Sequence, residues 1–303
     1  MSSSSYSGEP QVFRRLGPKP ASAARASSGA VPTATDTGAR AVAQLRQDLH
    51  LFMRQESVIE SPGSAASRLT VLLDMYRVLH SLSEGPVCWE SRAAARLART
   101  MESYTEELQA APHEASASAM RTFAQGIDLL AHLLEQHTPG LDETGPAPFV
   151  LVVDDEPLSR RLANLGMDRA GLAHISLDAS TEAAELLQRQ RFDLVILDIH
   201  MPDLDGFELC RRMRMMAFHA TTPVVFVTGQ NDLKARAKAS LSGGTDFIGK
   251  PFHGGELAVK ALGHILRVRS PRPLGDTAIF TLAGVGGRPH TVVAGDSPGV
   301  ACG

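Results

Sequence analysis

Two apolar segments of this chain, each with the composition of a buried β-strand, are followed by acidic residues. Asp154 and Asp155 come directly after the segment 149–153, and Asp198 comes directly after the segment 192–197. Because an open α/β sheet binds its ligands beyond the carboxyl ends of its strands, we expect these carboxylates to lie close together. Clustered carboxylates repel one another unless a cation neutralises them, and Mg²⁺ is typically held by one or two carboxylates with phosphate oxygens and waters. The spacing therefore predicts a Mg²⁺ site.

A hydroxyl group and an ammonium group are expected at the same edge of the sheet. Thr228 follows the strand-like segment 223–227, and Lys250 follows the segment 246–248 after one glycine. A carboxylate can accept a phosphoryl group and form an aspartyl phosphate. Mg²⁺, an ammonium and a hydroxyl can stabilise the oxygens of the transferring group. These residues therefore favour phosphoryl transfer onto one of the aspartates.

Strand-like and helix-like segments alternate in the second half of the chain, which predicts a doubly wound, parallel five-stranded (βα)5 domain over residues 148–269. The predicted strands are 149–153, 173–177, 192–197, 223–227 and 246–248. The predicted helices are 158–171, 181–190, 206–216, 232–242 and 254–268.

Four motifs of this domain, LVVDDEP, LVILDIHMPDLDGFEL, PVVFVTG and DFIGKPF, resemble the receiver domain of two-component response regulators in order and spacing. The resemblance implies that a sensor histidine kinase or a phosphotransfer protein donates the phosphoryl group, that Mg²⁺ is the cofactor, and that a downstream protein reads the result. It also implies a phosphoacceptor that catalyses its own phosphorylation and dephosphorylation rather than a turnover enzyme. The residue roles that it implies are phosphoacceptor for Asp198, metal ligand for Asp154 and Asp155, switch hydroxyl for Thr228 and phosphate-binding lysine for Lys250.

The same resemblance carries three further expectations. Phe247 matches the aromatic switch residue, which would turn inward when Thr228 moves toward the phosphoryl group. His200 would supply its backbone carbonyl to the metal, and its side chain would overhang the phosphoryl group and alter the rate of hydrolysis. The Lys250–Pro251 peptide bond is expected to be cis. A doubly wound fold without phosphorylation and a receiver used constitutively remain as alternatives.

Residues 41–137 have helical periodicity, interrupted at 61–64, 84–86 and 111–118, and the four resulting amphipathic segments predict a helical bundle. The fold class is therefore α + α/β, with the bundle preceding the receiver domain. The apolar stripes of the last two segments are Ala94, Leu97, Met101, Tyr104 and Leu108, then Met120, Phe123, Ile127, Leu130 and Leu134. The stripes of the first two are Val42, Leu45, Leu49, Phe52 and Met53, then Leu69, Leu72, Tyr76, Leu79 and Leu82.

The stretch 72–108 of this helical region resembles a histidine phosphotransfer domain, and the resemblance makes His80 a possible phosphohistidine. Ser83 stands where that family has a lysine, and Glu84 stands where it has a glycine. Both changes leave less positive charge for a phosphoryl group. Two interpretations stay open: a relay in which Asp198 and His80 both carry phosphate, and an interaction switch in which the bundle only docks a partner or dimerises.

The remaining segments are predicted to be disordered or connecting. Residues 1–40 and 270–303 are rich in small residues, Gly and Pro and lack sustained apolar periodicity, so we expect a disordered arm and a disordered tail. Residues 138–147 have the composition of a linker.

The composition argues against several classes of function. The net charge is −3 and basic residues are scattered, which gives no reason to expect nucleic-acid binding. No apolar run approaches the roughly 18 residues of a membrane span, and no secretory signal is expected at the N-terminus. The three cysteines, Cys88, Cys210 and Cys302, are widely spaced, which argues against a disulfide framework or zinc site and for the cytoplasm. A phosphatase of the haloacid-dehalogenase type is disfavoured, because its catalytic acid would stand at His200.

Overall fold

The computed structural model describes residues 34–56, 62–85, 91–135, 146–229 and 241–270. Predictions for residues 1–33, for the linker up to residue 145 and for residues 271–303 lie outside this part of the chain. The predicted helix at 232–242 lies almost wholly outside it as well. The described residues belong to one compact unit.

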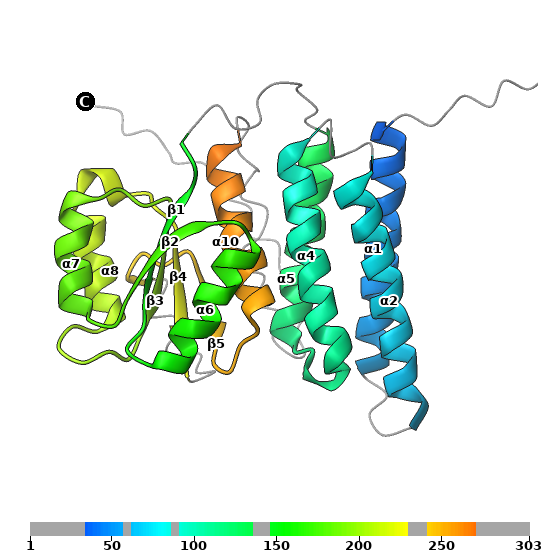
Figure 1. The fold of residues 1–303 in the computed structure, drawn as a ribbon, viewed down its shortest axis with the longest axis horizontal. Coiled ribbons are helices and arrows are strands. Elements are labelled where there is room, and N and C mark those ends of the chain that lie inside the picture. Colours follow the sequence, from blue (N-terminus) through cyan, green and yellow to red (C-terminus); the bar gives the residue numbers. More distant parts are fainter. Residues whose placement is uncertain (1–33, 57–61, 86–90, 136–145, 230–240, 271–303) are drawn as a thin grey trace, which may run out of the picture. The chain divides into compact units, whose positions relative to one another are not determined.

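The N-terminal region contains the four predicted helices: α1 (Ala34–Glu56), α2 (Pro62–Glu84), α4 (Arg92–Ala110) and α5 (Ala117–Glu135), with a short 3₁₀ helix, η1, at Pro112–Glu114 (Figure 1). Helix α2 packs against both α1 and α4, and α5 packs against α1 and α4. The stripes predicted for α4 and α5 are buried in full. In α1 and α2, by contrast, Met53 is 49% and Leu69 is 36% exposed, since these outer helices are covered on one side only.

Two predicted boundaries in this region are wrong. Helix α1 begins at Ala34, so residues 34–40 are helical and do not belong to the predicted arm. An acidic residue in its first turn, Asp36, complements the helix dipole there. Helix α2 begins at Pro62, inside the predicted interruption at 61–64. Proline is tolerated in the first helical turn, where its missing N–H has no intrahelical partner in any case.

The second half of the chain is a parallel sheet in the order β2-β1-β3-β4-β5, with helices on both faces, as predicted. The strands are β1 (Phe149–Val153), β2 (Ala173–Leu177), β3 (Leu194–Asp198), β4 (Val224–Thr228) and β5 (Asp246–Gly249). The helices are α6 (Pro157–Arg169), α7 (Ser180–Arg189), α8 (Gly206–Arg214) and α10 (Gly254–Arg269), with a 3₁₀ helix, η2, at Ala217–His219. The valine, isoleucine and leucine residues of β1, β3 and β4 are buried because both faces of the sheet are covered.

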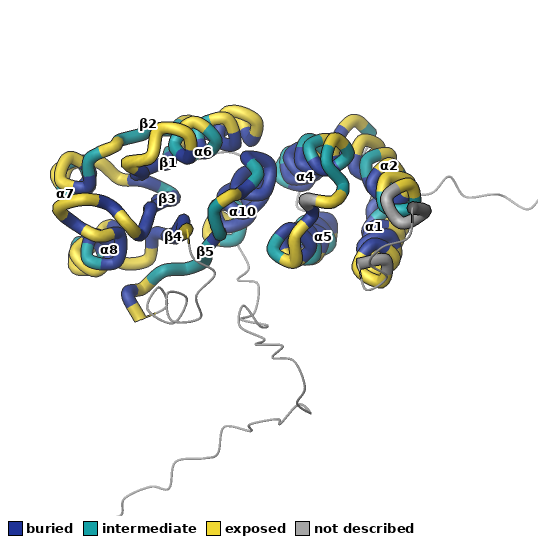
Figure 2. Tube along the Cα trace, turned by 90° about the horizontal axis from the view of Figure 1, so that it is seen from below, coloured by how far each residue is buried: buried dark blue, intermediate teal, exposed yellow. Residues whose placement is uncertain are grey.

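The two faces of the sheet pack against different helices. Helices α7 and α8 share one apolar core with one face. Helices α6 and α10 cover the other face, and their core continues without a break into the N-terminal helices. Every residue of α10 from Gly254 to Ile265 is buried, because the sheet lies on one side of it and α4 and α5 lie on the other (Figure 2).

Glycines permit the close packing of α10. A Cβ atom on Gly166 of α6 would lie 2.5 Å from the backbone oxygen of Gly254, and a Cβ atom on Gly255 would lie 2.7 Å from the Tyr104 ring of α4. Larger side chains at these positions would push the helices apart. The glycines therefore fix α10 between the sheet and the helical region.

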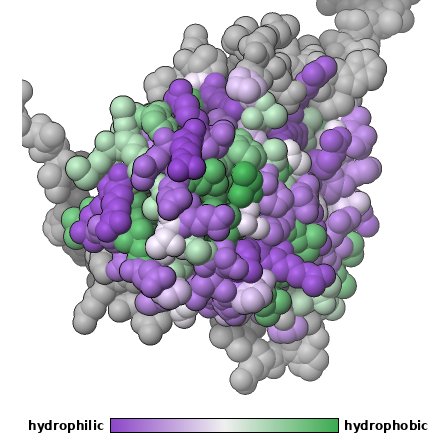
Figure 3. Space-filling model, turned by 60° about the vertical axis from the view of Figure 1, so that its left-hand side comes forward, coloured by the Kyte–Doolittle hydropathy of each residue, from purple (hydrophilic) through white to green (hydrophobic). Residues whose placement is uncertain are grey.

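The surface of the molecule is of mixed character. On the face shown in Figure 3, hydrophilic side chains predominate and surround smaller groups of apolar ones. Within the described ranges, none of the helices is long and apolar enough to cross a bilayer.

Candidate functional site

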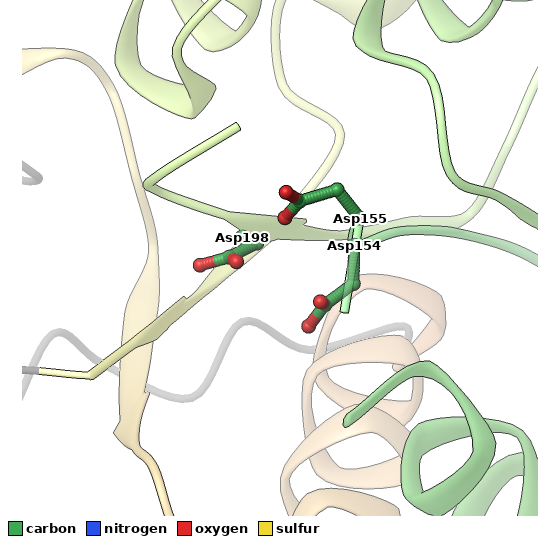
Figure 4. A group of neighbouring side chains, drawn as sticks. All are labelled: Asp154, Asp155 and Asp198. Atoms are coloured by element: carbon green, nitrogen blue, oxygen red, sulfur yellow. The ribbon is translucent and has the colours of Figure 1, made fainter. Parts of the chain in front are cut away.

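The predicted acidic residues meet at the carboxyl end of the sheet (Figure 4). Asp154 follows β1, and Asp198 is the last residue of β3, one position further into the strand than the sequence pattern indicated. Strand pairing sets Val153 beside Leu197, so the ends of β1 and β3 coincide. One carboxylate oxygen each from Asp154, Asp155 and Asp198 lie within 4.8 Å of one another. Such a set of oxygen donors fits a hard divalent cation.

Lys250 lies among these carboxylates. Its Nζ atom is 3.0 Å from Asp154 Oδ2 and 3.0 Å from Asp198 Oδ2. The backbone N–H of Lys250 donates to the carbonyl oxygen of Thr228 at 2.6 Å, which ties the end of β5 to the end of β4. The Lys250–Pro251 bond is cis, as expected. The structure thus brings the predicted lysine and the predicted acids together.

Two residues that the sequence analysis did not assign to the site also contact it. Glu156 Oε2 lies 3.1 Å from Lys250 Nζ, so a fourth carboxylate competes for the ammonium. The buried Ser159 hydroxyl donates to Asp154 Oδ2 at 2.5 Å and fixes the orientation of that carboxylate. Glu156 could have been found as the third acid of its run. Ser159 lies in the first turn of α6, and nothing in the motif marks it.

Burial and charge determine the protonation of the site. Burial raises the pKa of the Asp198 carboxyl, a hydrogen bond from Lys250 opposes this, and the charge of Asp154 raises the pKa further, so that it lies above its ordinary value. Burial lowers the pKa of Lys250, but its hydrogen bonds to Asp198 and Asp154 outweigh burial and raise it. The ammonium therefore stays charged, and one cation is shared by several carboxylates.

The loop after β3 leads from Asp198 to the start of α8 and folds back close to Asp198. A Cβ atom on Gly206 would lie 2.1 Å from the backbone oxygen of Asp198, so only glycine fits there. Asp205 caps α8 by accepting a hydrogen bond from the Glu208 N–H at 2.7 Å. His200 is exposed on this loop and lines a cleft of about 380 Å³ together with Asp155 and Phe207. Its side chain thus borders the acidic site.

Thr228 and Phe247 lie where the motifs indicated. Thr228 is the last residue of β4 and is buried, next to the end of β3 through the pairing of Asp198 with Val227. Phe247 is half-buried in β5 and packs against the core of α7 and α8. Their motion as a switch stays a prediction.

His80 lies at a second polar cluster, on α2. Its side chain is 55% exposed, and its Nδ1 atom is 2.8 Å from Glu102 Oε1 on α4. The Ser83 hydroxyl donates to the other Glu102 oxygen at 2.8 Å. Arg99 of α4 forms an ion pair with Glu84 at 3.0 Å, and its Nη2 atom lies 3.5 Å from the backbone oxygen of Ser83. A guanidinium thus stands near the position where the expected lysine is missing.

The second half of the chain is similar to known proteins. Residues 150–262 match the model of the response regulator receiver domain, a match that does not include the N-terminal helices. The transcriptional regulatory protein SpaR of Bacillus subtilis is 40% identical over 80 residues, which are 26% of this chain and 35% of that protein. AfsQ1 of Streptomyces coelicolor is 32% identical over 133 residues, 44% of this chain and 57% of that protein. The chain thus spans a third to somewhat over half the length of these relatives.

Among solved structures, the chemotaxis response regulator CheY4 of Vibrio cholerae is 29% identical to the matched region. The match covers 40% of this chain and 100% of that chain, with a TM-score of 0.38.

Proposed function

Residues 150–262 form a response regulator receiver domain, and on this premise we propose that Asp198 accepts a phosphoryl group from a phosphohistidine of a sensor histidine kinase or phosphotransfer protein. An Asp198 carboxylate oxygen attacks phosphorus, the P–N bond breaks, and its electron pair returns to the imidazole of the donor. The observation that carries this proposal is the convergence of Asp198, two further aspartates and Lys250 at one sheet edge.

The same residues fit a bound Mg²⁺. Asp154, Asp155 and Asp198, with the backbone carbonyl of His200, would hold it, and their clustered oxygen atoms are the donors that this ion prefers. When bound, the ion neutralises the repulsion between the acids and the phosphoryl oxygens. Lys250 and Thr228 contribute an ammonium and a hydroxyl to those oxygens. The hydrogen bond from the Ser159 hydroxyl fixes the position of the Asp154 carboxylate.

Incubation with acetyl phosphate and Mg²⁺, followed by intact-mass measurement, tests this proposal. Wild type should gain one phosphoryl group, and Asp198→Asn should gain none. Asp203→Asn is a matched control, because Asp203 lies on the same loop and asparagine tolerates its positive φ of 65°. That control should behave as wild type. An adduct that persists in Asp198→Asn, or the absence of any adduct with both acetyl phosphate and an active sensor kinase, contradicts the proposal.

A relay through His80 is a second candidate, supported by the contact with Glu102. A carboxylate that accepts the Nδ1 proton fixes the imidazole tautomer and leaves a lone pair on Nε2, which can attack phosphorus. The rival is an interaction switch in which the helices only dock or dimerise.

Replacing His80 with glutamine distinguishes the two. In a relay, His80→Gln should abolish transfer from phosphorylated Asp198 to histidine, measured as an acid-labile phosphoryl group, and Glu102→Gln should slow it. His132→Gln, on α5, serves as the matched control. Signalling that is unchanged in His80→Gln would contradict the relay through His80 and favour the interaction switch.

A further inference from the structure

We propose that the Glu156 carboxylate is a displaceable partner of Lys250. It holds the ammonium while Asp198 is unmodified, and an oxygen of the phosphoryl group replaces it when Asp198 is phosphorylated. This inference rests on the proposed function and adds a positioning residue that the motifs do not assign. The cluster that fits a cation consists of the three aspartates, whereas Glu156 contacts the ammonium, with its Oε2 atom 3.1 Å from Lys250 Nζ.

Among the described residues, three carboxylates contact the Lys250 ammonium, which is as many as it has N–H donors. Besides the contact with Glu156, its Nζ atom lies 3.0 Å from Asp154 Oδ2 and 3.0 Å from Asp198 Oδ2. A phosphoryl oxygen can therefore accept a full hydrogen bond from Lys250 only when one of these carboxylates gives up its contact.

Asp154 is held too firmly to be the carboxylate that leaves. Its side chain is only 3% exposed. The Ser159 hydroxyl donates to its Oδ2 atom at 2.5 Å, and the backbone N–H of Glu156 donates to its Oδ1 atom at 2.9 Å. Moving this carboxylate would leave these donors and the buried oxygen atoms without partners, which is costly. Asp198 stays in place as well, because the phosphoryl group is attached to it.

Glu156 can leave at little cost. Its side chain is 53% exposed, so its carboxylate is hydrated when it releases the ammonium, and an ion pair in contact with water contributes little. Glu156 is the N-cap residue of α6, but its side chain makes no capping hydrogen bond there. The start of the helix therefore does not depend on where this carboxylate points. Of the three carboxylates, Glu156 is the one that a phosphoryl oxygen displaces.

A phosphoryl group on Asp198 is the stronger competitor for the ammonium. It carries about two negative charges, and it is attached to a residue whose Oδ2 atom already lies 3.0 Å from Lys250 Nζ. Glu156 carries one charge and loses side-chain entropy when it holds the contact. Glu156 therefore yields to a phosphoryl group that is covalently attached, whereas its contact and its charge disfavour weakly bound anions such as free phosphate.

Calorimetric titration of the full chain with beryllofluoride, an anion that mimics a phosphoryl group on a carboxylate, tests the proposal. The Mg²⁺ concentration is chosen so that doubling it leaves the affinity unchanged. Glu156→Gln keeps the size of the side chain and removes its charge, so it should bind beryllofluoride about three- to tenfold more tightly than wild type. Glu156→Asp keeps the charge, but its shorter side chain caps α6 instead of reaching Lys250, and it should also bind more tightly.

The matched control is Glu182→Gln, because Glu182 is an exposed acid in the first turn of α7, which also begins at the carboxyl edge of the sheet. It should bind as wild type does. The proposal is overturned if either Glu156 variant binds no more tightly than wild type, or if Glu182→Gln tightens binding as much as they do. If wild type releases no more heat than Asp198→Asn, the proposed function itself fails. Thermal unfolding followed by circular dichroism confirms that each variant is folded.

Discussion

Tyr104→Ala should destabilise the helical region and the receiver domain together, by about 3–5 kcal/mol, the cost of removing a buried aromatic ring. Tyr104 is fully buried on α4. Its ring stacks on Phe123 of α5 at 4.9 Å and lies 6.1 Å from His253, at the start of α10. Because this ring contacts both halves of the chain, its loss opens a cavity at their junction. Urea unfolding should show one transition shifted to lower urea.

The matched control is Tyr104→Phe. The Tyr104 hydroxyl is buried and forms no hydrogen bond of ordinary geometry with the described residues, and the Glu256 carboxylate lies near it. Removing it keeps the ring and relieves the cost of a buried polar group, so stability should equal or exceed that of the wild type. The result that contradicts the shared core is two separate transitions in Tyr104→Ala, with the receiver domain unfolding at its wild-type urea concentration. Hydrogen exchange resolved to each half tells these outcomes apart.

Lys260→Met should be similarly costly, about 3–5 kcal/mol near pH 7, because it deprives the buried Asp246 carboxylate of one of its two partners. Lys260 Nζ lies 2.9 Å from Asp246 Oδ2, and His264 Nε2 lies 3.1 Å from the same oxygen. Burial by itself would raise the pKa of Asp246, but Lys260 and His264 outweigh burial and hold the pKa well below its usual range. Chemical denaturation at pH 7 measures the loss.

The pH dependence of this loss has a definite sign. In wild type the Asp246 pKa is depressed on folding, so its contribution is present above the unfolded pKa of about 3.9 and is lost as pH falls below that value. In Lys260→Met, burial is no longer balanced and the folded pKa rises, so the penalty is largest at neutral pH. The stability difference between the two proteins should therefore shrink on acidification from pH 7 to pH 5. A difference that is constant over this range would show that packing, and not charge, is what Lys260 contributes. The double variant Asp246→Asn/Lys260→Met should recover part of the loss.

The sequence predicted the residues of the acidic site because each lies at the carboxyl end of a strand or just beyond it. Parallel strands end at a common edge, so Asp154, Asp198 and Lys250 could be brought together without knowing any side-chain contact. Contacts that depend on side-chain reach could not be predicted. Glu156 reaches Lys250, and Ser159 reaches Asp154, only in the folded arrangement of α6 against β1.

In the helices, too, some features could be predicted from the sequence and others could not. The stripes of α4 and α5 predicted their buried faces correctly, since both helices are inside the molecule on that side. In α10, Lys260 and His264 have residue types that indicate a solvated face, yet both are buried. Periodicity reports how many sides of a helix are apolar, but the burial of these two polar residues depends on Asp246, which lies on another element. That pairing involves tertiary structure and no sequence pattern marks it.

The position of α10 also limits how this receiver domain can be transferred into another protein. In wild type, Glu256 accepts hydrogen bonds from Ser118 at 2.6 Å and from Thr122 at 3.2 Å, both on α5. A chimera joined within residues 138–147 would present the buried outer face of α10 to a foreign helical region, or to solvent, and the native α4 and α5 would lose the surface on which they rest. The natural exchange unit therefore includes the N-terminal helices, because one core runs from them into α10, so this receiver is a portable module only together with the helices that precede it.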